Sequence, residues 1–285
     1  MASTLPRSLS PTRLTSFTDC PLAFRLRSID RLPEPPSPHK AKGTLVHRAL
    51  ERLIWEHPPA QRTPAVAAAE LDMAWQELQD DPELADLGLT GAEATAFHGD
   101  AAALVQNYFV LEAPQKVHAV GVEVMLEADL DGVALRGIID RLDMNERGEL
   151  VVIDYKTGRA PGVRYEKSKL AGVHLYALLC ERALGVIPVE VRLLHLREPL
   201  TISASPTAQT LRGQRQRTLA VWQAIERACD QGDFQPRPSG LCSFCNFQQW
   251  CPAHGGTPPV FPLSSSDRTE GAGRRAQVRR TASAQ

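Results

Sequence analysis

Two carboxylates and an ammonium group fall on a predicted β-hairpin near the middle of the chain. Its loop, 146–148, ends in glycine, which freely takes the left-handed conformation that a three-residue hairpin loop favours at its third position. Continuing the register of this hairpin places Asp140 directly opposite Asp154, and directly opposed side chains share a face with Cβ atoms about 5 Å apart. Lys156 is two residues beyond Asp154, so it projects from the same face.

This arrangement suits a divalent cation next to a phosphate. Adjacent carboxylates repel each other unless a cation lies between them, and hard oxygen ligands suit Mg²⁺ or Mn²⁺. The ammonium group of Lys156 could position a water molecule or stabilise charge that develops on a phosphate. The alternative is a surface ion pair of Asp154 with Lys156 or Arg141. Because these charges end an apolar strand, 150–153, where an unneeded charge is costly, we favour phosphodiester hydrolysis.

The periodicity of apolar residues predicts the elements that position these groups. Helical spacing dominates the first half of the chain, and strand spacing begins at residue 117. The prolines of 33–40 exclude a helix in that segment. Helices are predicted at 11–28, 41–56, 64–79, 91–112, 166–185 and 207–231. Strands are predicted from 117, and at 133–143, 150–156 and 188–196. The order indicates a mixed α/β core with an N-terminal helical elaboration.

Length and composition limit the class of protein. A chain of 285 residues forms one large domain or two small ones, and 43% hydrophobic with 23% charged residues excludes a fully disordered protein. The sequence has no apolar run that spans a bilayer and no apolar signal core, so we expect a cytoplasmic protein without a membrane partner. The net charge of −1 means that any nucleic-acid footprint must be local.

The domain boundaries follow from composition. Residues 1–9 are expected to be flexible and 10–254 to form one folded domain, with a helical insertion at 64–112 and a cysteine segment at 235–254. Residues 255–285, which are Arg-rich and nearly free of apolar residues towards their end, are expected to be a disordered tail.

A local excess of basic residues follows the candidate site. Five basic side chains in 156–169 face only one acid, Glu166; they are Lys156, Arg159, Arg164, Lys167 and Lys169. Their position beside Asp154 favours phosphate contacts over an ordinary solvated face. Further candidates for DNA contacts are Arg212, Arg215 and Arg217. No base-reading motif is present, so we expect little sequence specificity.

The six cysteines indicate a second metal site. Cys242, Cys245 and Cys251 lie within ten residues of each other, which is typical of metal binding. A reduced compartment argues against a disulfide framework. A structural metal site needs a fourth ligand, and either His254 or Cys20 could supply it. The other two cysteines, Cys180 and Cys229, are expected to be ordinary buried thiols.

Four stretches together resemble a known family. Asp140 with the 154–158 run, DYKTG, resembles the core of PD-(D/E)XK nucleases, and this form resembles the RecB-type exonuclease branch. The stretch 43–51 resembles the G-x-x-x-H-x-x-L-E helix of that branch, and 17–24 resembles its N-terminal cysteine helix. The fourth stretch is the C-terminal cysteine cluster. The resemblance spans roughly residues 10–254 and implies a restriction-endonuclease-like mixed sheet flanked by helices.

The resemblance also implies roles for single residues. His47, Asp140, Asp154 and the backbone carbonyl of Tyr155 are implied ligands of Mg²⁺ or Mn²⁺, and Lys156 is implied to help activate water. The histidine ligand leans slightly towards Mn²⁺.

A departure from the family falls on the helix after this lysine. The family often carries a glutamine there, followed closely by a tyrosine. Tyr176 matches and is expected to act at the catalytic site, although a packed helix position is the alternative. His174 stands near the expected glutamine, and histidine can also hydrogen-bond a phosphate or a base.

Two acidic residues are further candidates. Glu51 lies four residues after His47 on the same helical face and could orient the imidazole. Glu123, on the neighbouring strand, either joins the acidic site or belongs to a solvated strand face.

The cysteines resemble those of the iron–sulfur branch, which includes AddB-like helicase subunits and a CRISPR-adaptation nuclease. That branch holds a [4Fe-4S] cluster with one N-terminal and three C-terminal cysteines. The resemblance therefore implies Cys20, Cys242, Cys245 and Cys251 as ligands of a structural cluster that ties the first helix to the last segment.

We therefore expect a metal-dependent DNA exonuclease of DNA repair or recombination that acts on single-stranded or free-ended DNA. A helicase subunit is a potential partner, because the sequence carries no P-loop of its own. Two alternatives stay open: a non-catalytic DNA-binding subunit of a helicase–nuclease assembly, and a zinc-stabilised nuclease.

Overall fold

A computed structural model describes residues 5–160 and 166–262, and describes the side chains of all of these except 166–173. The predicted contacts of Arg164, Lys167 and Lys169 and most of the predicted tail, 263–285, therefore lie outside the described residues. No helix among the described residues is long and apolar enough to cross a membrane.

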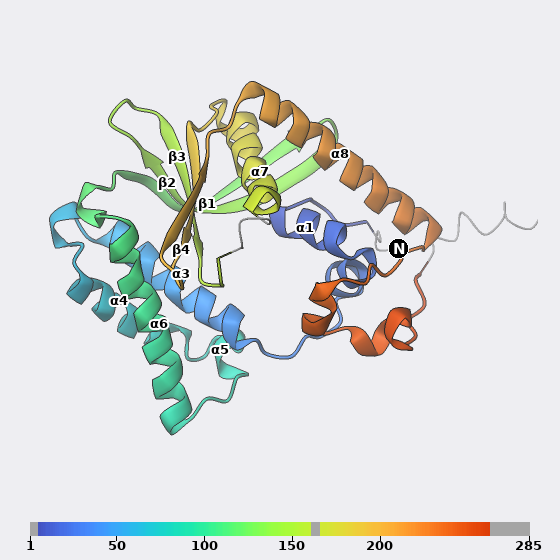
Figure 1. Cartoon of the computed structure of the whole chain (residues 1–285), viewed down its shortest axis with the longest axis horizontal. Coiled ribbons are helices and arrows are strands. Elements are labelled where there is room, and N and C mark those ends of the chain that lie inside the picture. Colours follow the sequence, from blue (N-terminus) through green and yellow to red (C-terminus); the bar gives the residue numbers. More distant parts are fainter. Residues whose placement is uncertain (1–4, 161–165, 263–285) are drawn as a thin grey trace, which may run out of the picture.

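One mixed sheet forms the centre of the fold, and its five strands follow the chain order β1-β2-β3-β4-β5 (Figure 1). The strands are β1 (Ala119–Leu130), β2 (Val133–Met144), β3 (Leu150–Lys156), β4 (Glu190–His195) and β5 (Leu200–Ala204). All pairs are antiparallel except β3 with β4, which are joined by a crossover helix as parallel strands require. The predicted mixed α/β core is confirmed and agrees with a restriction-endonuclease-like architecture.

Two hairpin turns set the register of the first three strands. At the β1–β2 turn, Asp131 and Gly132 both have positive φ, as a two-residue turn that matches strand twist requires. At the β2–β3 turn, Asn145 pairs with Glu149, and the ladder continues to Arg141 opposite Ile153. Regular pairing ends there, so the predicted opposition of Asp140 and Asp154 lies one step beyond the last described pair.

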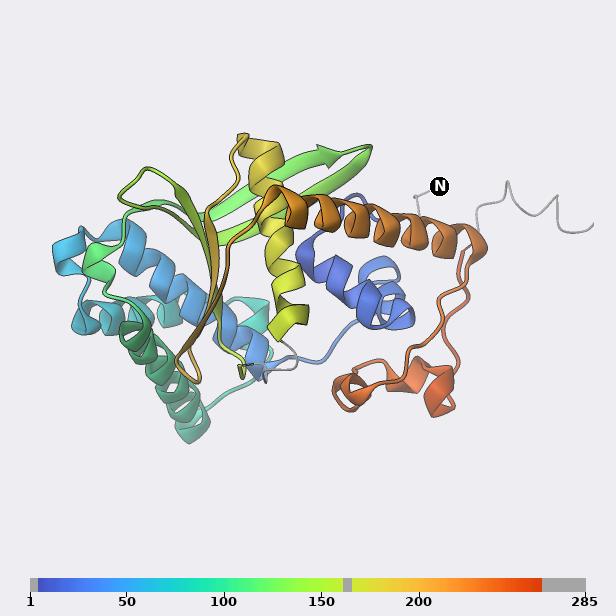
Figure 2. The ribbon, with the colours of Figure 1, turned by 45° about the horizontal axis from the view of Figure 1, so that its top comes forward.

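Helices cover both faces of the sheet (Figures 1 and 2). On one side lie the helices α3 (Pro38–Glu56), α4 (Pro64–Leu78), α5 (Pro82–Ala85) and α6 (Gly91–Leu111). On the other side lie the helices α1 (Pro11–Asp19), α2 (Pro21–Phe24), α7 (Glu166–Leu184) and α8 (Ala208–Gln231). The central strand β3 is buried on both faces: Val152 belongs to the core with α7 and α8, whereas Val151 and Ile153 belong to the core with α3 and α6.

Short helical turns complete the chain. A π-helical turn spans Arg25–Ile29, and 3-10 turns span Pro59–Gln61, Pro114–Lys116, Gly240–Phe244, Gln248–Trp250 and Pro252–His254. The last three of these turns make up most of the cysteine segment.

The structure corrects two predicted helix boundaries. The helix predicted at 11–28 breaks at Cys20, whose backbone is extended, because Pro21 lacks an N–H and restricts the residue before it. The segment 33–40 is non-helical only up to Ser37, whose side chain caps α3 while Pro38 takes its first position. Proline is tolerated there because the first helical N–H groups have no partner in the helix.

The N-terminal segment also departs from the expected boundary. Leu9 is 1% exposed and pairs in parallel with Leu135 of β2. Its N–H donates to the carbonyl of Ala134, and its carbonyl accepts from the N–H of Arg136. Leu9 therefore joins the edge of the sheet through a single parallel bridge, within the stretch 1–9 that is predicted to be flexible.

Candidate active site

Asp140 lies where β2 separates from β3. Its Oδ2 accepts a 2.7 Å hydrogen bond from the backbone N–H of Tyr155, so its carboxylate occupies the space that a paired strand would fill. The side chain is 12% exposed. Burial raises the pKa of Asp140 to about 6, and the neighbouring charge of Asp154 adds to this shift. A cation at this position would relieve both effects.

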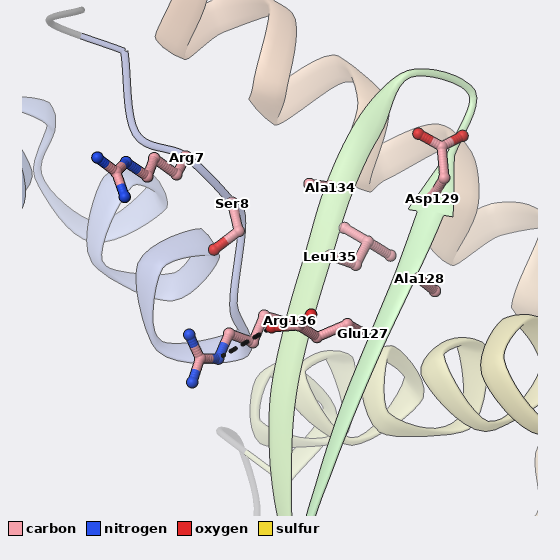
Figure 3. Close-up of a pocket in the computed structure, with 8 residues that line it drawn as sticks. All are labelled: Arg7, Ser8, Glu127, Ala128, Asp129, Ala134, Leu135 and Arg136. Atoms are coloured by element: carbon pink, nitrogen blue, oxygen red, sulfur yellow. Dashed lines mark ion pairs between the residues drawn. The ribbon is translucent and has the colours of Figure 1, made fainter. Parts of the chain in front are cut away.

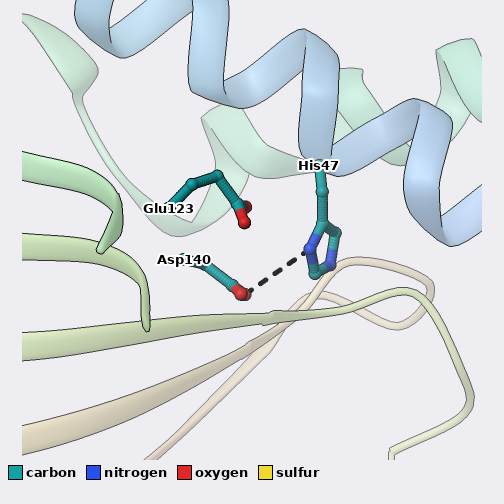
Figure 4. Close-up of side chains that lie close together, drawn as sticks. All are labelled: His47, Glu123 and Asp140. Atoms are coloured by element: carbon teal, nitrogen blue, oxygen red, sulfur yellow. Dashed lines mark ion pairs between the residues drawn. The ribbon is translucent and has the colours of Figure 1, made fainter. Parts of the chain in front are cut away.

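His47 reaches the same point from α3. Leu45, Val46 and Leu50 anchor this helix in the core, which leaves His47 facing the strands. Its Nε2 lies 3.1 Å from the carbonyl oxygen of Tyr155. Its Nδ1 lies 3.7 Å from Asp140 Oδ2, the ion pair drawn as a dashed line in Figure 4. One imidazole, one carboxylate and one backbone carbonyl thus converge, as the resemblance implies.

The close approach of α3 to β3 depends on a glycine. A Cβ at Gly43 would lie 3.3 Å from Thr157 Oγ1, closer than ordinary van der Waals contact. The helix segment before His47 therefore packs against the end of β3 because this position carries no side chain.

Glu123 completes the group, although the sequence left its role open. Donor atoms of His47, Glu123 and Asp140 all lie within 4.8 Å of one another (Figure 4). Glu123 is solvent-exposed as a residue, so it also faces solvent as the alternative interpretation expects; partial desolvation of its carboxyl raises its pKa, and the charge of Asp140 adds to this effect. The register of the β1–β2 hairpin, in which Leu130 pairs with Val133, sets Glu123 opposite Asp140 and is a signal that the sequence contains.

The backbone of Glu123 is strained. Its φ is 46°, in the left-handed region that favours glycine, asparagine and aspartate.

Glu51 has a different partner from the one expected. It pairs with Arg48 at 2.9 Å, whereas the imidazole of His47 contacts the carbonyl of Tyr155.

Asp154 and Lys156 form an ion pair at the end of β3. The carboxylate is 4% exposed and the lysine side chain 45% exposed, so the ammonium group stands at the solvent boundary of the site. Burial opposes the charge of Lys156, but the carboxylates of Asp154 and Asp140 outweigh it and raise the lysine pKa. The residue is therefore a cation at neutral pH.

Tyr176 of α7 stands beside these carboxylates. Burial raises the pKa of its hydroxyl, and the charges of Asp154 and Asp140 raise it further, so Tyr176 is neutral. Two residues earlier, burial lowers the pKa of His174, and its Nδ1 has no hydrogen-bond partner among the described residues. Tyr176 thus reaches the predicted site, whereas His174 makes no described contact with it.

Of the arginines predicted to contact DNA, one is exposed to solvent and another forms an ion pair within the protein. Arg159 is exposed beyond β3. Arg215 of α8 instead pairs with Asp131 in the β1–β2 turn at 2.6 Å, an interaction that ties α8 to the hairpin.

The cysteines of the two chain ends surround one cavity. Cys20, Cys242, Cys245 and Cys251 all line a space of about 240 Å³, and His254 lines it as well. All six cysteines are free of disulfides. Cys180 and Cys229 are buried elsewhere, as expected for ordinary thiols.

Backbone amides point at two of these sulfurs. The N–H of Arg237 donates to Cys20 Sγ at 3.4 Å, and the N–H of Ser239 donates to Cys242 Sγ at 3.3 Å. Pro236 and Pro238 alternate with these two residues and have no N–H of their own. The segment 236–239 therefore directs all of its N–H groups towards the cysteine sulfurs.

A larger hollow of about 530 Å³ lies away from both groups, between the N-terminal segment and the β1–β2 hairpin (Figure 3). Its charged residues are Arg7, Glu127, Asp129 and Arg136, and Glu127 pairs with Arg136 at 3.5 Å. None of the predicted site residues lines it.

Comparison with known proteins agrees with this geometry. Residues 8–252 match the family model of the PD-(D/E)XK nuclease superfamily. The Gene 69 protein of Mycobacterium phage D29 is 24% identical over 273 residues, covering 85% of this chain and 96% of the phage protein. The Gene 69 protein of Mycobacterium phage L5 is 31% identical over 134 residues, covering 46% and 44%.

One solved structure is similar along nearly the whole chain. It is the crystal structure of a candidate exonuclease from Eubacterium rectale, with a TM-score of 0.54 and 15% identity over 93% of this chain and 94% of that one. At this identity the likeness concerns the fold alone.

Proposed function

The chain belongs to the PD-(D/E)XK nuclease superfamily, and on that premise we propose that it is a Mg²⁺- or Mn²⁺-dependent DNA exonuclease of DNA repair or recombination. The observation that carries the proposal is the convergence of His47, Glu123, Asp140 and the Tyr155 carbonyl beside the Asp154–Lys156 pair. The choice of an exonuclease follows the resemblance of the 154–158 run to the RecB-type branch, and the structural neighbour described as a candidate exonuclease has a similar fold.

The donor set fits a divalent cation. His47, Glu123 and Asp140 offer donor atoms within 4.8 Å of one another, and the Tyr155 carbonyl lies beside His47, so these four would hold it. Asp154 lies outside that group and would be a further oxygen ligand. When bound, the cation supplies a Lewis acid that lowers the pKa of a water molecule and neutralises phosphate charge. The raised pKa of Asp140 supports this role, because two buried carboxylates without a cation are costly.

Besides the cation, Lys156 supplies a positive charge from the protein itself. Its ammonium group is held by Asp154 and is 45% exposed, so it can reach both a water molecule and a phosphate oxygen. There it orients the attacking water and stabilises the negative charge of the pentacovalent phosphate. Tyr176, which is neutral and adjacent to Asp154, can donate a hydrogen bond from its hydroxyl to an oxygen of the same phosphate and keeps its proton.

A DNA end is the proposed substrate. Linear and covalently closed circular DNA of the same sequence, incubated with Mg²⁺ or Mn²⁺, test this directly. Degradation of only the linear form, whether double- or single-stranded, supports an exonuclease. Cleavage of the circle contradicts it, and binding without cleavage in either metal supports the non-catalytic DNA-binding subunit instead. A helicase partner for this end-directed activity remains part of the proposal.

We also propose that the four cysteines hold a [4Fe-4S] cluster. The common cavity of Cys20, Cys242, Cys245 and Cys251 supports it, as do the amides directed at Cys20 and Cys242, because hydrogen bonds to ligand sulfurs are usual at such clusters. A reducing, cytoplasmic location is part of the proposal, because thiolate ligands require cysteines that are kept reduced.

Zinc is the alternative occupant of this site. Structural Zn²⁺ sites take four cysteines, or three cysteines and a histidine, and His254 lines the same cavity.

Metal analysis of anaerobically purified protein separates the two. Iron and acid-labile sulfide in equal amounts, lost in Cys20→Ser and kept in the buried control Cys180→Ser, support the cluster. Stoichiometric zinc without iron supports the zinc-stabilised nuclease.

A further inference from the structure

A buried arginine lies directly behind the candidate metal site. Arg141 is 0% exposed, and its guanidinium uses all five N–H donors. Nε and Nη2 bind both oxygens of Asp143 at 2.8 and 2.9 Å, and Nη2 binds both oxygens of Glu112 at 3.0 and 2.8 Å. Nη1 donates to two phenol oxygens, Tyr155 at 2.6 Å and Tyr108 at 3.0 Å.

One of these two tyrosines carries atoms of the site itself. Tyr155 lies between Asp154 and Lys156 in β3. Its N–H binds the carboxylate of Asp140, and its carbonyl contacts Nε2 of His47. The same residue therefore touches two predicted metal ligands with its backbone and the buried arginine with its side chain.

The other tyrosine is a matched counterpart without site atoms. Tyr108 lies on α6, is as deeply buried as Tyr155, and accepts a hydrogen bond from the same guanidinium nitrogen. The two rings also pack edge to face, with centroids 5.9 Å apart. Substituting each tyrosine in turn therefore distinguishes the contribution of Arg141 to folding from its contribution to the site.

We propose that Arg141 is a positioning residue for metal binding, acting through the hydroxyl of Tyr155. The ion pairs with Glu112 and Asp143 fix the guanidinium, and the 2.6 Å bond fixes the Tyr155 side chain. The Tyr155 N–H and carbonyl then hold Asp140 and His47 at the separation that a cation requires. This inference rests on the proposed function only in that the site binds a divalent cation.

Removal of each hydroxyl in turn tests the proposal. Tyr155→Phe and Tyr108→Phe each leave the guanidinium with one unused donor, so both lower the melting temperature. Mn²⁺ binding, followed by the electron paramagnetic resonance signal of free Mn²⁺, is expected to weaken about tenfold in Tyr155→Phe and to stay within twofold of wild type in Tyr108→Phe. Arg141→Lys, which keeps the charge and loses the planar fork, is expected to follow Tyr155→Phe.

Three results overturn the proposal: wild-type Mn²⁺ affinity in both phenylalanine variants, equal weakening in both, or a wild-type protein that binds no Mn²⁺. If Arg141→Lys does not fold, the Mn²⁺ affinities of Tyr155→Phe and Tyr108→Phe still test the proposal. Because the signal reports binding rather than cleavage, a protein that binds Mn²⁺ but cuts no DNA refutes the nuclease and leaves the positioning role to be judged on its own.

Discussion

The carboxylate of Asp140 accepts a 2.7 Å hydrogen bond from the backbone N–H of Tyr155, across the point where β2 and β3 separate. This bond replaces a rung of the β-ladder with a side chain, since Arg141 and Ile153 form the last described pair of β2 with β3. The carboxylates of Asp140 and Glu123 and the imidazole of His47 lie together at this point. The candidate metal site thus lies where the regular pairing of β2 with β3 ends.

The raised pKa of Asp140 predicts a pH dependence of metal binding. The folded value is about 6, against about 3.9 in an unfolded chain. A carboxyl whose folded pKa is raised makes the metal-free protein less stable as the pH rises from about 4 to 6. A bound cation offsets this loss only where Asp140 is ionised, and a proton competes with it below pH 6.

Thermal denaturation with and without MnCl₂ checks this. The rise in melting temperature on adding Mn²⁺ is expected to be large at pH 7.5 and small at pH 5. Asp140→Asn is expected to be more stable than wild type without metal at pH 7.5 and to gain nothing from Mn²⁺. An equal gain at both pH values in wild type contradicts the assignment of Asp140 as a ligand.

The strained backbone at Glu123 predicts a difference between two substitutions. Both Glu123→Gly and Glu123→Ala remove the carboxylate, and both are expected to weaken Mn²⁺ binding. Only glycine relieves the φ of 46°, so Glu123→Gly is expected to be about 1 kcal/mol more stable to urea than Glu123→Ala. Unchanged Mn²⁺ affinity in both variants would show that Glu123 is no ligand.

The contact between α3 and β3 predicts opposite effects of the same substitution at two glycines. Alanine normally stabilises an exposed helix position by up to about 1 kcal/mol relative to glycine, and Gly99 on α6 has nothing within 4 Å of an added Cβ. Gly99→Ala is therefore expected to stabilise the protein and to leave its activity unchanged.

Gly43→Ala differs because its Cβ meets Thr157 Oγ1 at 3.3 Å. It is expected to gain no stability and to lose several-fold in DNA cleavage, because His47 moves with α3. Urea unfolding and initial cleavage rates of both variants test this, and equal behaviour of the two alanines contradicts the tight approach.

The local signals of the sequence predicted the hairpin best. The glycine of the 146–148 loop predicted the β2–β3 register as far as Arg141 opposite Ile153, and one further step of that register would set Asp140 against Asp154. The Asp131–Gly132 turn likewise predicts the β1–β2 register, which sets Glu123 opposite Asp140. That prediction requires extending the register through β1 to Glu123, where the backbone leaves the regular strand conformation.

Other features depend on contacts that no local pattern contains. The partners of Arg141 come from α6, β2 and β3, and the sequence offered only a surface pair with Asp154 for it. The strand β5 was not predicted, since its five residues are mostly exposed and it gains its pairing from β4. The break at Cys20 was missed because the apolar spacing continues across Pro21.

Release of nucleotides from end-labelled linear DNA in the presence of Mn²⁺ or Mg²⁺ is the decisive measurement. It compares wild type with Asp154→Asn and Lys156→Met, and with Asp72→Asn, an exposed acid on α4, as the control. We predict metal-dependent release that falls by about 10²-fold or more in the two site variants and is unchanged in the control. Release that survives in Asp154→Asn or Lys156→Met, or its absence from wild type in both metals, would contradict the assignment of this site as the nuclease centre.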